Sequence, residues 1–133
     1  TGGYALNTWV SSETTSGLQG QWADRHRYAK ASQAKRPSMT PLLMDGNWVG
    51  ASPSAKNPPA RDQYEGRKDD FGRITIDRHG NPSPNRNVTG YPLPGRNNMA
   101  FLDGHAELTP LDDYYEFDWH RDWEKPTVRP TPQ

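Results

Sequence analysis

One stretch of sequence decides the expected fold: Asn98-Met99-Ala100-Phe101-Leu102-Asp103-Gly104-His105-Ala106-Glu107. It holds an Asp-Gly pair between two alternating runs, which is a strong hairpin signal because both central residues of a type I′ turn have φ > 0. With the turn at Asp103-Gly104, Leu102 faces His105 and the strands pair outward from there. Side chains alternate along each strand, so this register predicts one buried apolar face. That face consists of Met99, Phe101, Ala106 and Leu108.

Three further segments have the composition of strands, and two have that of long loops. Tyr4–Val10 alternates along one side, and Pro41–Met44 is a short apolar run. Phe71–His79 alternates apolar with polar residues and is predicted as a third strand. Residues 50–70 and 80–97 are rich in proline and polar residues, which predicts long surface loops.

Only two helices are expected. Gln21–Lys35 carries a thin apolar stripe, and Pro37 ends it. A second, short helix is expected over residues 110–117, where Thr109 is placed to cap the helix and Pro110 suits its first turn. The expected fold class is therefore α+β, with a small antiparallel β-sheet, long loops and one short C-terminal helix.

The composition indicates one domain with a small aromatic core. Apolar residues make up 31% of the 133 residues, yet there are five Trp, six Tyr and three Phe. So low an apolar fraction predicts a core that neighbouring molecules complete in part. Residues 1–123 are assigned to the domain and residues 124–133 to an extended Pro-rich tail. A formal net charge of +0 disfavours nucleic-acid binding, and the lack of Cys removes disulfides and thiolate zinc sites.

Several segments together resemble one bacterial family, the prepilin-like, type II secretion pseudopilin-like proteins abundant in planctomycetes. The C-terminal processing-associated domain of that family is named for a His and an Asp-Gly pair separated by nine residues. The segments that are similar, in the family's order, are Gly3–Trp9, Pro37–Asp45, Arg78-His79, Asn98–Glu107 and Pro110–Trp123.

The resemblance implies both a fold and a function. It implies a pilin-like globular head that serves as a structural subunit of a type IV pilus-like or pseudopilus-like extracellular filament. The location implied is extracellular or at the bacterial cell surface, and the partners are further copies of the chain. A hydrophobic N-terminal helix, from the same precursor or from a small partner pilin chain, would complete the subunit. An enzyme is not expected, and the sequence has no Ser-His-Asp order, phosphate-binding loop or zinc-protease helix motif.

Two features depart from the family pattern. The spacing between His79 and Asp103 is much longer than nine residues, so residues 81–96 are interpreted as a loop insertion. The prepilin cleavage site and the long apolar helix of the family are not found in the sequence. We therefore expect the sheet face formed by Ile74, Ile76, Met99 and Phe101 to be covered partly by a helix from outside residues 1–133.

A metal site is one interpretation of the polar residues near the hairpin. If strand 71–79 and the hairpin are neighbours, their polar faces bring Asp77, His79, Asp103 and His105 together. His and carboxylate ligands suit a divalent cation, and calcium is the candidate because pseudopilin-like heads hold it in C-terminal loops. A structural interpretation competes and is favoured: the turn explains Asp103, and hydrogen bonding at a strand end explains His79.

The aromatic residues and one Asn motif allow further interpretations. A secreted carbohydrate-binding module would use exposed Trp and Tyr side chains, since flat rings stack on sugars. The favoured alternative makes the tryptophans core or interface anchors, namely Trp9, Trp22, Trp48, Trp119 and Trp123. Asn87-Val88-Thr89 fits the N-glycosylation pattern and lies in an expected loop, so Asn87 is a candidate modification site.

Overall fold

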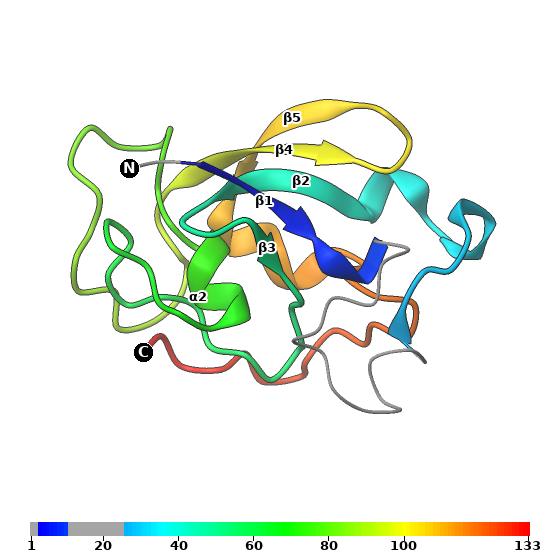
Figure 1. The fold of residues 1–133 in the computed structure, drawn as a ribbon. Coiled ribbons are helices and arrows are strands. Elements are labelled where there is room, and N and C mark those ends of the chain that lie inside the picture. The colour runs from blue at the N-terminus through cyan, green and yellow to red at the C-terminus, as the bar shows by residue number, and fades with distance from the viewer. Residues whose placement is uncertain (1–2, 11–25) are drawn as a thin grey trace.

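A five-stranded sheet forms the centre of the computed structural model, which describes residues 3–10 and 26–133 (Figure 1). The spatial order of the strands is β3-β1-β2-β4-β5. Strands β1 and β3 pair in parallel, and the other neighbours are antiparallel. The fold is thus mixed, with a mostly antiparallel sheet and few short helices. The strands are β1 (Gly3–Asn7), β2 (Pro41–Gly46), β3 (Gly50–Ala51), β4 (Arg96–Phe101) and β5 (Ala106–Pro110).

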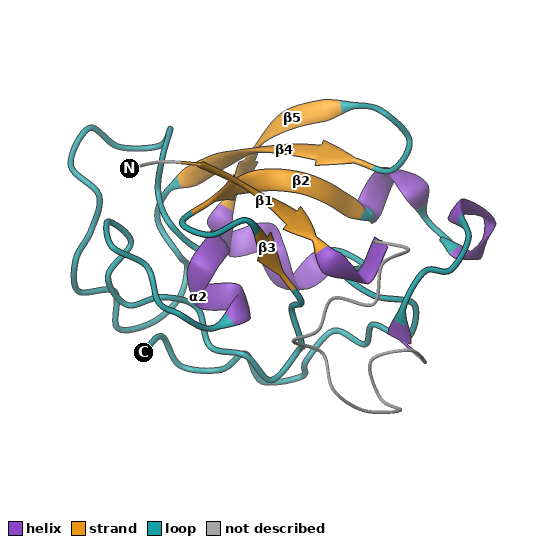
Figure 2. Ribbon diagram, viewed as in Figure 1, coloured by secondary structure: helices purple, strands orange, loops and turns teal. Residues whose placement is uncertain are grey.

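The helices of the described residues are short. α2 has five residues, and no helix there is long and apolar enough to cross a membrane. Figure 2 shows α2 and the 3-10 helix η4 on the same side of the sheet, where they cover one of its faces. The elements are α2 (Asp70–Ile74) and the 3-10 helices η1 (Thr8–Val10), η2 (Ala31–Gln33), η3 (Pro37–Met39) and η4 (Leu111–Glu116).

The predicted hairpin exists, but its register differs by one residue. Ala100 pairs with Ala106, and the loop is closed by hydrogen bonds from Phe101 N to His105 O and from Gly104 N to Phe101 O. Only Gly104 in this loop has a positive φ, +94°, so the expected type I′ turn is wrong. A one-residue shift turns every side chain of β5 to the other face. Leu108 is therefore 44% exposed, and Thr109 takes the buried position.

The inner face of the sheet, the one turned toward α2 and η4, carries an aromatic core. The Phe71 ring stacks on Tyr115 with ring centroids 4.7 Å apart, and Trp119 contacts Phe71 edge-on at 5.6 Å. Met44 and Met99 close the core from the sheet side and are almost fully buried. Large aromatic side chains bury much apolar area per residue, so a chain with few apolar residues still assembles a core.

The expected strand over Phe71–His79 is wrong. Asp69 accepts a hydrogen bond from Gly72 N at 2.8 Å and caps α2, which begins at the next residue. Phe71 and Ile74 lie three residues apart and both point into the core, as the spacing of a helix requires. The helical period therefore prevails over the alternation that favoured a strand.

The other two helix predictions are partly corrected. Of the helix expected over Gln21–Lys35, residues 21–25 lie outside the described residues, His26 is helical, and residues 27–35 contain only the three-residue η2. The short C-terminal helix is present as η4, but Pro110 precedes it and no side chain caps it. Asp112 instead accepts hydrogen bonds from Leu93 N and from the Arg129 guanidinium.

The face expected to need a helix from another segment is already covered. Ile74, Ile76, Met99 and Phe101 are each no more than 1% exposed. Ile74 belongs to α2 rather than to the sheet, and the aromatic side chains of η4 and the following residues pack beneath the strands. The expectation that an outside helix covers this face is therefore wrong.

Backbone hydrogen bonds connect the two long loops to each other and to the C-terminal tail. Gln63 N donates to Asn85 O, and Val88 N donates to Arg61 O, so the two Pro-rich loops lie side by side. Residues 124–133 contain no helix or strand. The tail nevertheless packs back, since Gln133 N donates to Pro59 O and Arg61 N donates to Gln133 O. These backbone hydrogen bonds order segments that have no regular structure of their own.

Candidate functional site

The outer face of the sheet carries a row of apolar side chains. Leu6 pairs with Leu43, Leu43 with Ala100, and Ala100 with Ala106, so one residue from each of four adjacent strands lies in line. Leu43 is 38% exposed, whereas Met44 beside it is fully buried in the core. We call this group the outer stripe: Leu6, Leu43, Ala100, Ala106 and Leu108.

A His-carboxylate pair lies on the same outer face. His79 Nε2 is 3.0 Å from Asp45 Oδ2, and Asn98 N donates to the same carboxylate oxygen at 2.8 Å. The side-chain amide of Asn98 lies 2.9 Å from His79 Nε2. Asp45 ends the run Pro37–Asp45 and Asn98 begins the hairpin stretch. The pair therefore fixes the loop that precedes β4 onto two paired strands.

The second His-carboxylate pair closes the hairpin loop. Asp103 Oδ1 lies 2.5 Å from His105 Nδ1 and also accepts a hydrogen bond from His105 N. The hydrogen bond with His105 lowers the pKa of Asp103. The His105 ring stacks on Phe101 with centroids 4.5 Å apart. Both residues thus have a local structural role in the turn.

The four residues expected to share a metal are not brought together. Asp77 accepts hydrogen bonds from Gly80 N and Arg96 N at the start of β4, whereas Asp103 lies in the loop that follows the end of β4. The hairpin's neighbour is β2 rather than the segment 71–79, so the shared polar face does not form. Within residues 3–10 and 26–133, no cluster of three or more His, Cys, Asp or Glu is arranged to hold a metal.

A histidine cluster that the sequence did not single out as a site lines an open cleft. His26 Nδ1 lies 3.0 Å from Asp122 Oδ2, and the His26 and His120 rings are 4.6 Å apart. His120 is packed between Trp9 and Trp123. Burial, with a smaller effect of His26, lowers the pKa of His120 to about 4, so its ring is neutral at pH 7. A neutral, buried imidazole of this kind is a packing element.

The tryptophans divide into core and surface residues. Trp119 is fully buried and Trp9 is 7% exposed, as expected of anchors, whereas Trp48 is 61% exposed. Trp22 lies outside the described residues. The candidate glycosylation residue Asn87 is exposed in its loop, where its side-chain oxygen accepts a hydrogen bond from Arg61 Nε at 2.6 Å.

Pairing between distant segments explains what sequence reasoning missed. The partner of His79 is Asp45, which is identified only when β2 and β4 are known to be neighbours. The outer stripe depends on the hairpin register.

Comparison with protein-family models, curated proteins and solved structures finds no match to this chain.

Proposed function

We propose that this chain is the pilin-like globular head of a structural subunit in a type IV pilus-like or pseudopilus-like extracellular filament of a bacterium. The observation that carries the proposal is the outer stripe, a row of partly exposed apolar side chains on the outer face of the sheet, on the side opposite to α2 and η4. Contiguous exposed apolar surface is typical of an interaction site. The order of the motif segments, similar to that of pseudopilin-like proteins, supports the same function.

The occupant of the outer stripe in this proposal is a neighbouring subunit of the same filament. The formal net charge is +0, so copies of the chain approach one another without net repulsion. A repeated array also gives every subunit the same contact. A hydrophobic N-terminal helix, from the same precursor or from a small partner pilin chain, forms the filament core, and it has no part in burying the inner face.

The test compares filament formation by variants of the full-length protein in its bacterial host. Leu43→Glu places a charge in the middle of the outer stripe and should abolish filaments seen by electron microscopy with an antibody to this chain. Val128→Glu is the matched control, because Val128 is 83% exposed and lies in the tail. Circular dichroism of both purified heads checks that they fold.

Two outcomes would overturn the proposal. In the first, the wild-type protein is displayed at the cell surface without any filament that the antibody labels. In the second, Leu43→Glu assembles as efficiently as Val128→Glu, which would show that the outer stripe makes no subunit contact.

A further inference from the structure

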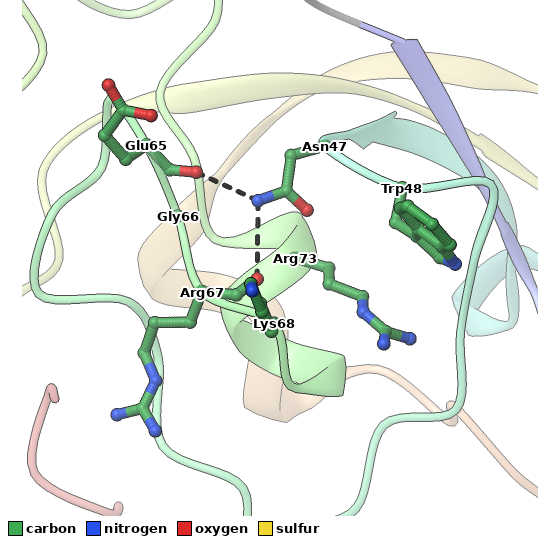
Figure 3. A pocket seen from close by; sticks show the side chains of 7 residues that line it. All are labelled: Asn47, Trp48, Glu65, Gly66, Arg67, Lys68 and Arg73. Carbon is green, nitrogen blue, oxygen red and sulfur yellow. Dashed lines mark hydrogen bonds between the residues drawn. The ribbon is translucent and has the colours of Figure 1, made fainter.

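We propose that a surface pocket beside Trp48 binds an acidic oligosaccharide, with a sugar ring stacked on the indole and a single carboxylate held by Lys68. The pocket has a volume of about 550 Å³, within the usual range for small-molecule sites. Figure 3 shows its lining side chains, which come from the turn after β2, the loop before α2, and α2 itself. They are Asn47, Trp48, Glu65, Gly66, Arg67, Lys68 and Arg73.

The walls of this pocket are held in place by hydrogen bonds. Asn47 Nδ2 donates to Glu65 O at 2.9 Å and to Arg67 O at 3.3 Å, as the dashed lines of Figure 3 indicate. Asn47 N donates to Arg73 O, which ties the same residue to α2. Gly66 has φ +70° and leaves no room for a Cβ, which would lie 2.7 Å from the Asn47 amide. A pocket formed in advance binds its ligand with little ordering cost.

Trp48 provides an apolar platform at the edge of the pocket. Its side chain is 61% exposed, which is unusual for a residue of this size. The Arg73 guanidinium lies 5.9 Å from the ring centroid and orients the indole by a cation–π contact. The face of an aromatic ring is negative, so it attracts the weakly positive C–H groups of a sugar ring.

Of the charged side chains that line the pocket, only Lys68 has no ion-pair partner among the described residues, and Glu65 lies 4.0 Å from Arg86, so the pocket offers one cation to an acidic group of the ligand. Arg67 pairs with Asp69 at 2.9 Å, and Arg73 lies 3.7 Å from Asp70. One unpaired ammonium suits one carboxylate, whereas a polyphosphate chain requires a strongly positive surface. A sugar acid therefore fits better than a nucleic acid.

This inference is independent of filament assembly, because no residue of the outer stripe lines the pocket. The pocket beside Trp48 is thus a specific location for the polysaccharide binding that the exposed aromatic residues suggested. The residues that carry it are the stacking ring of Trp48 and the ammonium of Lys68.

The experiment is an NMR titration of the ¹⁵N-labelled full chain with trigalacturonate. The Trp48 indole signal, identified by its loss in Trp48→Phe, should shift on addition of ligand. Trp48→Ala should weaken binding about tenfold, the effect of losing one stacked aromatic contact. Lys68→Gln should weaken binding of trigalacturonate about fivefold and leave any binding of neutral cellotriose unchanged. Tyr4→Ala is the control, since Tyr4 is an equally exposed aromatic residue outside the pocket.

Three further probes decide between ligands. Cellotriose that binds as tightly as trigalacturonate would overturn the role of Lys68. A hexathymidine strand or acetate that shifts the Trp48 signal more strongly than trigalacturonate would overturn the saccharide assignment. No shift of the Trp48 signal with trigalacturonate at millimolar concentration would overturn the whole inference, provided that circular dichroism shows a folded chain.

Discussion

The two faces of the sheet differ in how far their apolar side chains are buried. On the inner face, Met44 and Met99 pack against aromatic rings and are almost completely inaccessible to solvent. On the outer face, Leu43 and Leu108 keep more than a third of their surface exposed. Both faces carry apolar residues, so composition does not distinguish them. The difference is that η4 and α2 both cover the inner side (Figure 2).

This contrast separates residues that stabilise the fold from residues available for contacts. A side chain of the inner face stabilises the isolated chain, so its loss lowers the free energy of unfolding. A side chain of the outer face is already hydrated, and its loss costs the isolated chain little. The proposed function of the outer stripe depends on this separation.

The largest effect is expected from Phe71→Ala. Phe71 is fully buried and contacts Tyr115 and Trp119, so the variant should lose about 3–5 kcal/mol of unfolding free energy. Leu43→Ala on the outer face should lose less than about 1 kcal/mol. Urea denaturation of both variants measures the difference, and equal losses would mean that the two faces are equally buried in solution.

Two neighbouring residues of β4 give a sharper comparison. Asn97 is fully buried and donates to Ile74 O and Tyr114 Oη, whereas Asn98 is exposed on the outer face. Asn97→Ala leaves buried acceptors unpaired and should cost about 1–3 kcal/mol, against about 0.5 kcal/mol for Asn98→Ala. Thermal melts of the two variants check this, and the reverse order would contradict the register of β4.

The hairpin loop that sets this register is tested by Gly104→Val. Gly104 has φ +94° and open space around its Cβ position, so a substitution there strains the backbone but causes no steric clash. A β-branched residue at this φ should cost more than about 1 kcal/mol. Gly90→Val is the control, because the Cβ position of Gly90 also meets nothing within 4 Å and its φ is not positive. Equal melting temperatures for the two variants would count against the observed turn.

The smallest effect concerns the buried His120. Its pKa is lowered to about 4 by burial, and the unfolded chain has the ordinary value near 6.5. Between these pKa values the unfolded state binds more protons than the folded state. The contribution of neutral His120 to the free energy of unfolding is therefore fully present above pH 6.5 and is lost as the pH decreases to 4. We expect a loss of about 1 kcal/mol, reduced from the full shift because solvent screens a partly accessible ring. In His120→Gln, unfolding measured from pH 4 to 7 should have a flatter pH dependence, and an unchanged profile would remove His120 as its source.

Local signals predicted the elements that a short stretch of sequence marks by itself, through a turn or an apolar run. The Asp-Gly pair located the β4–β5 hairpin, and the apolar run from Pro41 located β2. The register failed because Asp103 accepts hydrogen bonds from His105 within the loop, so that only Gly104 needs a positive φ. The composition of the loop does not indicate whether one or both of its central residues take a positive φ.

The candidate site was harder to predict because it depends on contacts between distant segments. The sequence indicated His79 as a candidate metal ligand, but it did not indicate that Asp45 would be the partner of His79. The pocket beside Trp48 requires Asn47 to hold a loop whose path sequence patterns do not give. Residues 71–79 were predicted wrongly as a strand because Ile74 and Ile76 alternate with polar residues, whereas the cap at Asp69 starts a helix.

The hydrogen bonds of Asn7 have a consequence for how this chain folds during synthesis. Asn7 Nδ2 donates to Pro41 O and to Trp119 O, the second of which is 112 residues away. Contacts so distant along the chain close large loops and are slow to form. The strand β1 therefore has no complete set of partners until Trp119 has left the ribosome. We expect nascent chains that end before Trp119 to expose their aromatic side chains and to depend on chaperones that hold unfolded segments.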